Sequence, residues 1–137
     1  MLMLLAGCAQ GPPRPVEIEA ADTCATCRMA ISELRYAAEL IDGERRLYKF
    51  DDIGCMTRFA RAHGLIEGRG ARANVFVRDY SGSGWLEGAG AQYVESPRIP
   101  SPMASGLIAL PDRQAAQQYA IRFQGRVLDF AELWVCQ

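Results

Sequence analysis

The residues best suited to chemistry gather in the stretch from Asp22 to Met29, which reads Asp-Thr-Cys-Ala-Thr-Cys-Arg-Met. Cys24, Cys27 and Met29 place three sulfur atoms within six residues. A thiolate and a thioether together favour Cu(I), whereas Zn²⁺ prefers thiolate with imidazole and takes thioether poorly. In an extended segment Cys27 and Met29 project to the same face, and Cys24 would join them only through a turn. The stretch therefore predicts a soft-metal site centred on Cys27 and Met29.

The two cysteines of this stretch also permit a redox interpretation, because Cys24-Ala-Thr-Cys27 has the spacing of a thioredoxin-like motif. Such a motif should follow a strong strand and open an amphipathic helix. Here the preceding segment 16–19 is short, and residues 28–34 lack a long apolar face. Dithiol chemistry and a purely structural disulfide both stay open as alternatives.

Other sulfur-bearing residues have simpler explanations. Methionine most often fills gaps in cores, but Met103 lies between Pro102 and Ser105-Gly106, which would fix its position as a weak thioether ligand requires. Cys55 and Met56 fall early in a predicted helix, where neighbours in sequence point about 100° apart, and core packing is the favoured interpretation.

Polar residues offer little for hydrolytic chemistry. His63 is the only histidine, which leaves almost no material for His-rich zinc hydrolase sites or Ser/His/Asp triads. Its place before Gly64 predicts that it complements a helix dipole, with a role as an extra metal ligand as the alternative. Asp51 or Asp52 is expected to cap the helix that follows.

Periodicity and turn signals predict an α+β fold of two small related ββαβ-type units, packed as one compact domain. The predicted strands are 36–41, 45–50, 73–80, 91–95, 107–110 and 126–128, and the predicted helices are 53–63, 112–123 and 129–135. The copper-binding domain is expected to span 22–137, with halves of roughly 22–90 and 91–137.

Composition limits the function. The 137 residues, half of them apolar, suffice for one compact domain. A net charge of −1 leaves no basic surplus for a phosphate backbone, so no nucleic-acid partner is expected. The cysteine count of five is odd, so in an oxidising compartment at least one must be free, modified, metal-bound or paired between chains.

The N-terminus predicts a lipid anchor. Residues 1–8 end in Leu-Ala-Gly-Cys8, similar to the box at which bacterial lipoproteins are cleaved and acylated, although no Lys or Arg precedes Cys8. The alternative is an apolar N-terminus with an ordinary cysteine. Residues 9–21 read as a flexible Pro-rich tether. No later run reaches the roughly 18 apolar residues of a membrane span, so any attachment would be by lipid.

Together these pieces resemble the NosL family, exported copper-binding lipoproteins that accompany nitrous oxide reductase. The matching features are the Leu-Ala-Gly-Cys8 box, Cys24-x-x-Cys27-x-Met29 followed by Ile31, Phe50-Asp51-x-Ile53-Gly54-Cys55-Met56, Asp79-Tyr80 with Gly84-Trp85, Ala91-x-Tyr93-Val94, and Pro102-Met103-x-x-Gly106. They run in family order from Cys8 to about Leu133.

The resemblance implies a metallochaperone, not an enzyme, that delivers Cu(I) for the copper-sulfide centre of nitrous oxide reductase together with a membrane transporter complex. It implies Cys27, Met29 and Met103 as ligands, a lipid anchor at Cys8, and a periplasmic location at the outer membrane. It further implies a fold similar to a domain of organomercurial lyase.

The sequence departs from the family pattern at Arg28 and Ala104, where glycine is common. Arg28 would either lower the pKa of the neighbouring Cys27 thiol or point to solvent. Two enzymes remain as competing hypotheses. One is an exported thiol-disulfide oxidoreductase that uses Cys24 and Cys27, and the other is an organomercurial-cleaving enzyme.

Overall fold

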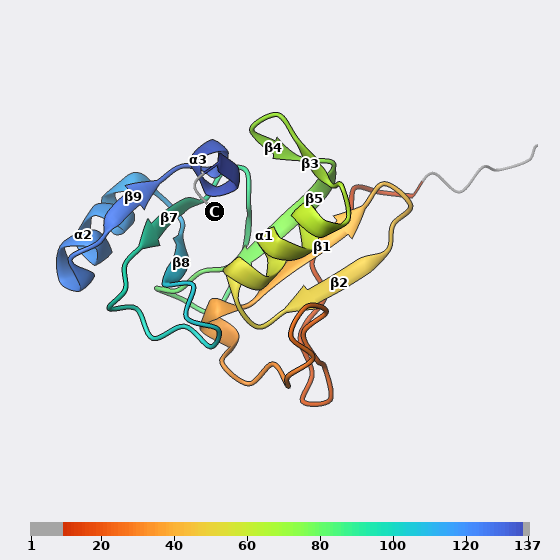
Figure 1. Cartoon of the computed structure of the whole chain (residues 1–137), viewed down its shortest axis with the longest axis horizontal. Helices are drawn as coiled ribbons and strands as arrows, with labels where there is room; N and C mark the ends of the chain where they lie inside the picture. Colours follow the sequence, from red (N-terminus) through yellow and green to blue (C-terminus); the bar gives the residue numbers. More distant parts are fainter. Residues whose placement is uncertain (1–9, 136–137) are drawn as a thin grey trace, which may run out of the picture.

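The computed structural model describes residues 10–135, and the first half of this range forms an antiparallel sheet with the strand order β2-β1-β5-β6 (Figure 1). Its strands are β1 (Ala38–Asp42), β2 (Leu47–Phe50), β5 (Ala73–Arg78) and β6 (Trp85–Glu87). Asp42 closes the β1–β2 turn, because its Oδ1 accepts hydrogen bonds from the backbone N–H groups of Glu44 and Arg46, each at 2.9 Å. A small hairpin of β3 (Ile66–Glu67) and β4 (Gly70–Ala71) precedes β5.

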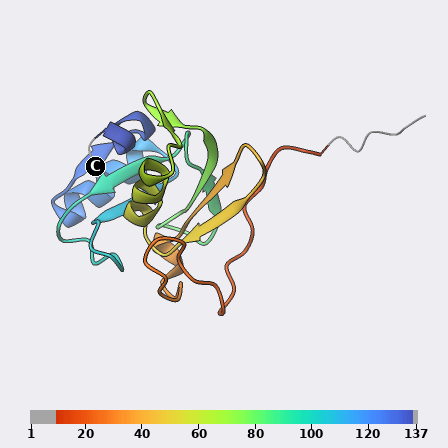
Figure 2. The same cartoon turned by 45° about the vertical axis from the view of Figure 1, so that its right-hand side comes forward.

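Helix α1 (Ile53–Ala62) lies between this four-stranded sheet and the sheet of the second half, and it contacts β1, β2 and β8 (Figure 2). Asp52 caps its N-terminus, since Oδ1 accepts the Gly54 N–H at 2.7 Å. After the helix, Gly64 adopts a left-handed conformation, with φ of 65°, that suits glycine. Because both sides of α1 face protein, seven of its ten residues are buried.

The second half forms a three-stranded antiparallel sheet with the order β8-β7-β9. Its elements are β7 (Gln92–Glu95), β8 (Leu107–Leu110), helix α2 (Arg113–Phe123), β9 (Arg126–Leu128) and helix α3 (Phe130–Val135). Helix α2 contacts all three strands. Asp112 caps α2 by accepting the Ala115 N–H at 2.8 Å.

The two halves share one hydrophobic core. Phe50 and Met56 of the first half belong to the same buried cluster as Tyr93 and Leu107 of the second. At the junction, the Tyr80 N–H donates to the Ala109 carbonyl at 2.9 Å. The halves therefore form one mixed α/β domain, as the sequence predicts.

The segment predicted as a tether lies against the first sheet from Val16 onward. The Val16 N–H donates to Glu39 Oε2 at 2.8 Å, and Ile18 packs against the core. Glu39 is thereby buried on β1. The signal residues 1–8 with Cys8, together with Cys136, lie outside the described range.

Most predicted elements are confirmed, including the 42–43 turn and both long helices. Strand β1 begins at Ala38, two residues later than predicted. Leu34–Tyr36 forms a 3₁₀ turn instead, with a hydrogen bond from the Tyr36 N–H to the Glu33 carbonyl. Strands β3, β4 and β6 were not predicted; each has only two or three residues. Relatedness between the halves and similarity to organomercurial lyase stay predictions. None of the described helices combines the length and apolar character needed to cross a membrane.

Candidate metal centre

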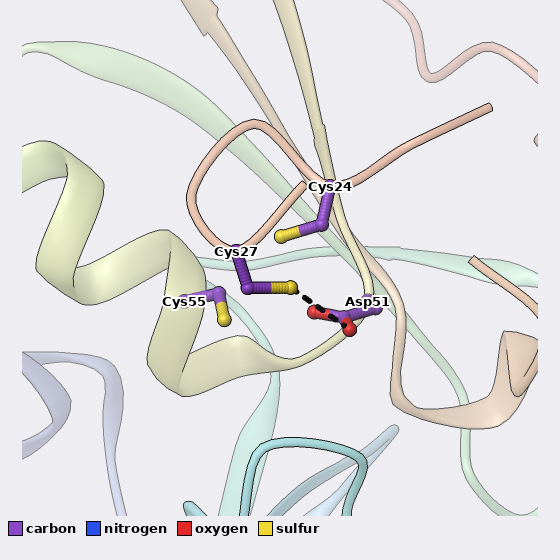
Figure 3. Close-up of side chains that lie close together, drawn as sticks. All are labelled: Cys24, Cys27, Asp51 and Cys55. Carbon is purple, nitrogen blue, oxygen red and sulfur yellow. Dashed lines mark hydrogen bonds between the residues drawn. The ribbon is translucent and has the colours of Figure 1, made fainter. Parts of the chain in front are cut away.

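Four side chains of the first half converge on one point. Sγ atoms of Cys24, Cys27 and Cys55 and a carboxylate oxygen of Asp51 all lie within 4.8 Å of one another. Figure 3 shows the four side chains pointing toward a common space. Cys24 and Cys27 come from the turn at residues 24–29, which we call the N-terminal turn, Asp51 from the end of β2, and Cys55 from the start of α1. We call this group the thiol cluster.

The N-terminal turn is closed by its own backbone. The Cys24 N–H donates to the Met29 carbonyl at 2.8 Å, and the Arg28 N–H donates to the Cys24 carbonyl at 2.9 Å. Arg28 has φ of 67°, in the left-handed region. The segment is therefore not extended, so the expectation that Cys27 and Met29 share a face does not apply. The turn that Cys24 would need in order to reach Cys27 is present instead.

Two further bonds attach this turn to the domain. The Ala25 N–H donates to the Lys49 carbonyl on β2 at 2.9 Å. The Thr26 hydroxyl donates to the carbonyl of Cys55, in the first turn of α1, at 2.8 Å. Because these partners lie on β2 and α1, the turn brings its cysteines to the place where the helix begins.

Asp51 and Asp52 have separate roles, although the sequence offered either as a cap. Asp52 caps α1, and its Oδ2 also accepts the Met103 N–H at 2.9 Å. Asp51, which is 3% exposed, accepts a hydrogen bond from Cys27 Sγ at 3.3 Å through Oδ2. Its Oδ1 is buried without a hydrogen-bond partner. A buried unpaired carboxylate oxygen beside three thiols is the arrangement expected of a cation site.

Burial disfavours the charged form of two of the cluster thiols, Cys27 and Cys55. Burial raises the pKa of Cys27 above its ordinary value, and Cys24 and Asp51 raise it further, against an opposing backbone hydrogen bond at Met29. Burial also raises the pKa of Cys55, to which Arg58 Nη2 donates at 3.3 Å. The sequence left two roles open for Arg28. Its side chain is exposed to solvent, as one of them predicts, and the other prediction, a lowered pKa of Cys27, was wrong. A metal ion bound by the Cys27 and Cys55 thiols would displace their protons.

The side chains nearest to Cys27 in the cluster are not the two methionines that the sequence predicted as its fellow ligands. Met29 is 61% exposed, at the surface of the turn. Met103 is half-buried in the loop between β7 and β8, against the same core cluster as Cys24 and Cys55. Its N–H bond to Asp52 places that loop beside the start of α1. The ligand roles of Met29 and Met103 stay predictions.

The cluster contains Cys24, which the sequence argument placed second to Cys27, and Cys55, which it assigned to the core. Cys55 belongs both to the core and to the cluster, because it is fully buried and its Sγ lies near those of Cys24 and Cys27. The helical spacing of Cys55 and Met56 concerns neighbours within one helix and carries no information about a turn docked from elsewhere. His63 lies apart from the cluster, with Nδ1 2.9 Å from the Phe59 carbonyl and its ring stacked on Phe59.

Fold and site together define a mixed α/β domain with a buried group of donors for a thiophilic metal ion. The family model of NosL matches residues 15–134, and the chain belongs to the NosL family. The structure is similar to the crystal structure of the copper chaperone NosL from Shewanella denitrificans, with a TM-score of 0.80 and 18% sequence identity over 93% of this chain and 100% of that chain. At this identity the likeness concerns the fold. No curated protein matches the chain.

Proposed function

We propose that this protein is a periplasmic Cu(I) carrier, which supplies copper for maturation of the copper-sulfide centre of nitrous oxide reductase. The observation that carries the proposal is Cys27, which is the partly exposed member of the thiol cluster in a chain of the NosL family. The similar solved structure is that of a copper chaperone. Soft sulfur donors suit Cu(I).

In the proposed site, Cys27 thiolate neutralises the charge of Cu(I), while Met29 and Met103 add neutral sulfur donors. The exposure of Met29 supports this division, because a ligand at the surface can be replaced stepwise by a ligand of a receiving protein. The loop of Met103 already approaches the start of α1 through Asp52. Such a site would bind copper tightly and still exchange it.

The proposed setting follows the family. A lipid on Cys8 would attach the protein to the outer membrane, and a membrane transporter complex would take part in the same maturation. Radiolabelled fatty acid should enter the wild-type chain in a bacterial host and should not enter a Cys8→Ser variant. Equal labelling of both chains, or of neither, would rule out the anchor at Cys8.

An anaerobic Cu(I) titration against a competing chelator tests the carrier function. The unacylated chain (Cys8→Ser) is compared with the same chain carrying Cys27→Ser, Met29→Ala or Met103→Ala. Cys27→Ser should lower the affinity the most, because it removes the only proposed charged donor. Equal binding by all four proteins would contradict the proposal.

A thiol-disulfide oxidoreductase is the second candidate, favoured by the proximity of Cys24 and Cys27 within one turn. Neither cysteine begins a helix, and the pKa of Cys27 is raised, whereas a reactive thiol needs a lowered one. Met29→Ala separates the two candidates. A carrier loses Cu(I) affinity in this variant, whereas an oxidoreductase keeps its dithiol potential.

A further inference from the structure

We propose that residues 16–22, which we call the strap, dock reversibly on the first sheet, and that release of the strap opens the N-terminal turn and exposes Cys24 and Cys55. The inference goes beyond the carrier function, because it concerns a movement of the chain that needs no metal ion. The strap leads directly into the turn along the sequence, so a movement of one segment acts on the other.

Polar contacts attach the strap to the sheet. Trp85 Nε1 and Arg78 Nη1 donate to the two carboxylate oxygens of Glu17 at 3.2 and 3.5 Å. Glu17 is nevertheless 77% exposed, and Val16 is 48% exposed. Ile18 packs against the hydrophobic core. Because contacts at the surface are screened by water and contribute little stability, the strap is attached weakly.

Two buried polar atoms at the contact between strap and sheet have no hydrogen-bond partner among the described residues. One is Oε1 of Glu39, whose Oε2 accepts the Val16 N–H at 2.8 Å. The other is Nε of Arg78, whose guanidinium bonds to Glu17. A buried polar atom without a partner is unfavourable, and water would bond to both atoms after release of the strap. The docked state is therefore favoured less than its hydrogen bonds alone would suggest.

Asp22 connects the strap to the turn. Its Oδ2 accepts hydrogen bonds from Lys49 Nζ at 2.6 Å and from the Glu19 N–H at 2.7 Å. Its carbonyl accepts the Ile31 N–H at 3.1 Å and so closes the base of the loop that contains the turn. Lys49 Nζ also donates to the Glu17 carbonyl at 3.2 Å. One side chain, Lys49, therefore bonds both to the strap and to the base of this loop.

Release of the strap would leave the turn with few bonds to the domain. The Ala25 N–H donates to the Lys49 carbonyl at 2.9 Å. The Thr26 hydroxyl donates to the Cys55 carbonyl at 2.8 Å. Cys24 and Cys55 are fully buried where the turn meets α1. A segment with few contacts opens at a lower free energy than the whole domain, so the turn should open once its base is free.

Glu39 makes release of the strap dependent on pH. Its buried carboxyl group lies opposite Lys49 in the β1–β2 pair and near Glu17 and Asp22 of the strap. Burial, with a smaller effect of these two carboxylates, raises the pKa of Glu39 to about 7, against the Val16 N–H bond and Lys49. After release, water reaches the group and its pKa returns toward 4.5. The docked strap therefore loses stability as the pH rises from 4.5 to about 7.

Native-state hydrogen exchange of the full chain, in the unacylated Cys8→Ser form, tests the inference without a metal ion. The Ala25 and Arg28 amides report on the turn, and the Val94 and Ile108 amides report on the second sheet. After correction for intrinsic rates, we expect the turn amides to exchange at least about tenfold faster than the sheet amides. Equal protection of turn and sheet would overturn the inference, because the turn would then open only with the whole domain.

Lys49→Gln links this opening to the strap. It removes the cation but keeps the backbone carbonyl that binds Ala25, and it should raise the exchange rates of the turn amides by about fivefold or more. Arg72→Gln, which removes the exposed ion pair with Glu67, is the matched control and should leave these rates within about twofold. Unchanged turn exchange in Lys49→Gln, or an equal change in the control, would overturn the inference.

The pH dependence is measured on the same amides. As the pH rises from 4.5 past 7, the protection of the turn should fall by about tenfold or more in the wild type and stay nearly level in Glu39→Gln. A level profile in the wild type would overturn the coupling to Glu39.

Alkylation at a single pH, resolved by site with mass spectrometry, tests exposure of the thiols. Cys24 and Cys55 should react about fivefold faster or more in Lys49→Gln than in the wild type, and equally fast in Arg72→Gln and the wild type. Faster turn exchange without faster alkylation would overturn the claim that the opening exposes these thiols. Neither measurement uses copper, so the carrier proposal and this inference can each fail while the other stands.

Discussion

The two halves of this molecule share a strand-and-helix topology but differ in the residues that they bury. In each half a central strand, β1 or β7, pairs with the next strand, β2 or β8, and with a later strand, β5 or β9. An aspartate-capped helix follows β2 in the first half and β8 in the second. Helix α1 lies between the sheets and buries seven residues, whereas α2 buries only Ala116. The three cysteines of the described range all belong to the first half.

The comparison shows what the thiol cluster needs beyond the topology that the two halves share. A turn at residues 24–29 docks on the start of α1 and contributes two of the four donors, and β7 has no such segment before it. The second half instead contributes the Met103 loop, which bonds to Asp52. The thiol cluster therefore arises where an added turn meets a buried helix end, and a loop from the other half lies beside it.

The largest expected difference between the halves lies in their helices. Phe59→Ala on α1 should lower the free energy of unfolding by about 3–5 kcal/mol, because this 8%-exposed ring packs against Tyr48, Phe50 and His63. Ile121→Ala on α2, at 80% exposure, should change it by about 0.5 kcal/mol or less. Urea unfolding followed by circular dichroism measures both. Similar losses would mean that the helices are equally buried.

Capping aspartates provide the next test. Asp52→Ala should cost about 2–4 kcal/mol, because it leaves both the Gly54 and Met103 N–H groups without their buried acceptor. Asp112→Ala should cost about 1 kcal/mol, since it removes one exposed cap. The same unfolding measurement applies. A smaller loss for Asp52 than for Asp112 would contradict the link between Asp52 and the Met103 loop.

The first half also buries a carboxyl group in its central strand, where β7 buries Tyr93 and Val94. Burial raises the pKa of Glu39 to about 7 from an ordinary 4.5. Between these values the unfolded chain loses a proton that the folded chain retains, so stability should fall by about 1–3 kcal/mol as the pH rises through this interval.

Glu39→Gln is the control for this pH dependence. Its amide oxygen can still accept the Val16 N–H, and the side chain no longer ionises. Unfolding free energies at several pH values should therefore decline for the wild type and stay nearly level for Glu39→Gln. Parallel curves for the two proteins would exclude Glu39 as the cause.

The smallest effect concerns strained backbone beside the predicted ligands. Arg28 and Ala104 have φ of 67° and 58°, where glycine lacks the steric cost of a side chain. Arg28→Gly and Ala104→Gly should each raise stability by up to about 1 kcal/mol, less the larger entropy of the unfolded glycine chain. Gln124→Gly, with φ of 54° at the end of α2, is the matched variant of the second half. A loss of stability in both site variants but not in Gln124→Gly would show that these side chains make stabilising contacts.

Local signals were sufficient for much of this fold. Apolar spacing and a capping aspartate located α1 and α2, and the Asp42-Gly43 turn located the first hairpin. The candidate site was predicted less completely, because Cys55 and Asp51 reach the other thiols only through the docked turn. Likewise the left-handed Arg28, which rotates Met29 out of the expected register, follows from hydrogen bonds of the closed turn. Sequence spacing describes neighbours along one element and not such contacts between elements.

The central claim is that Cu(I) binds at Cys27 with sulfur donors from both halves. X-ray absorption at the copper and selenium edges, on selenomethionine-labelled protein loaded with Cu(I), tests it most directly. The account predicts a copper shell of sulfur and selenium without nitrogen or oxygen, with copper beside selenium, and loss of that copper–selenium contact in Met29→Ala Met103→Ala. A copper shell of nitrogen and oxygen, or an unchanged shell in Cys27→Ser, would contradict it.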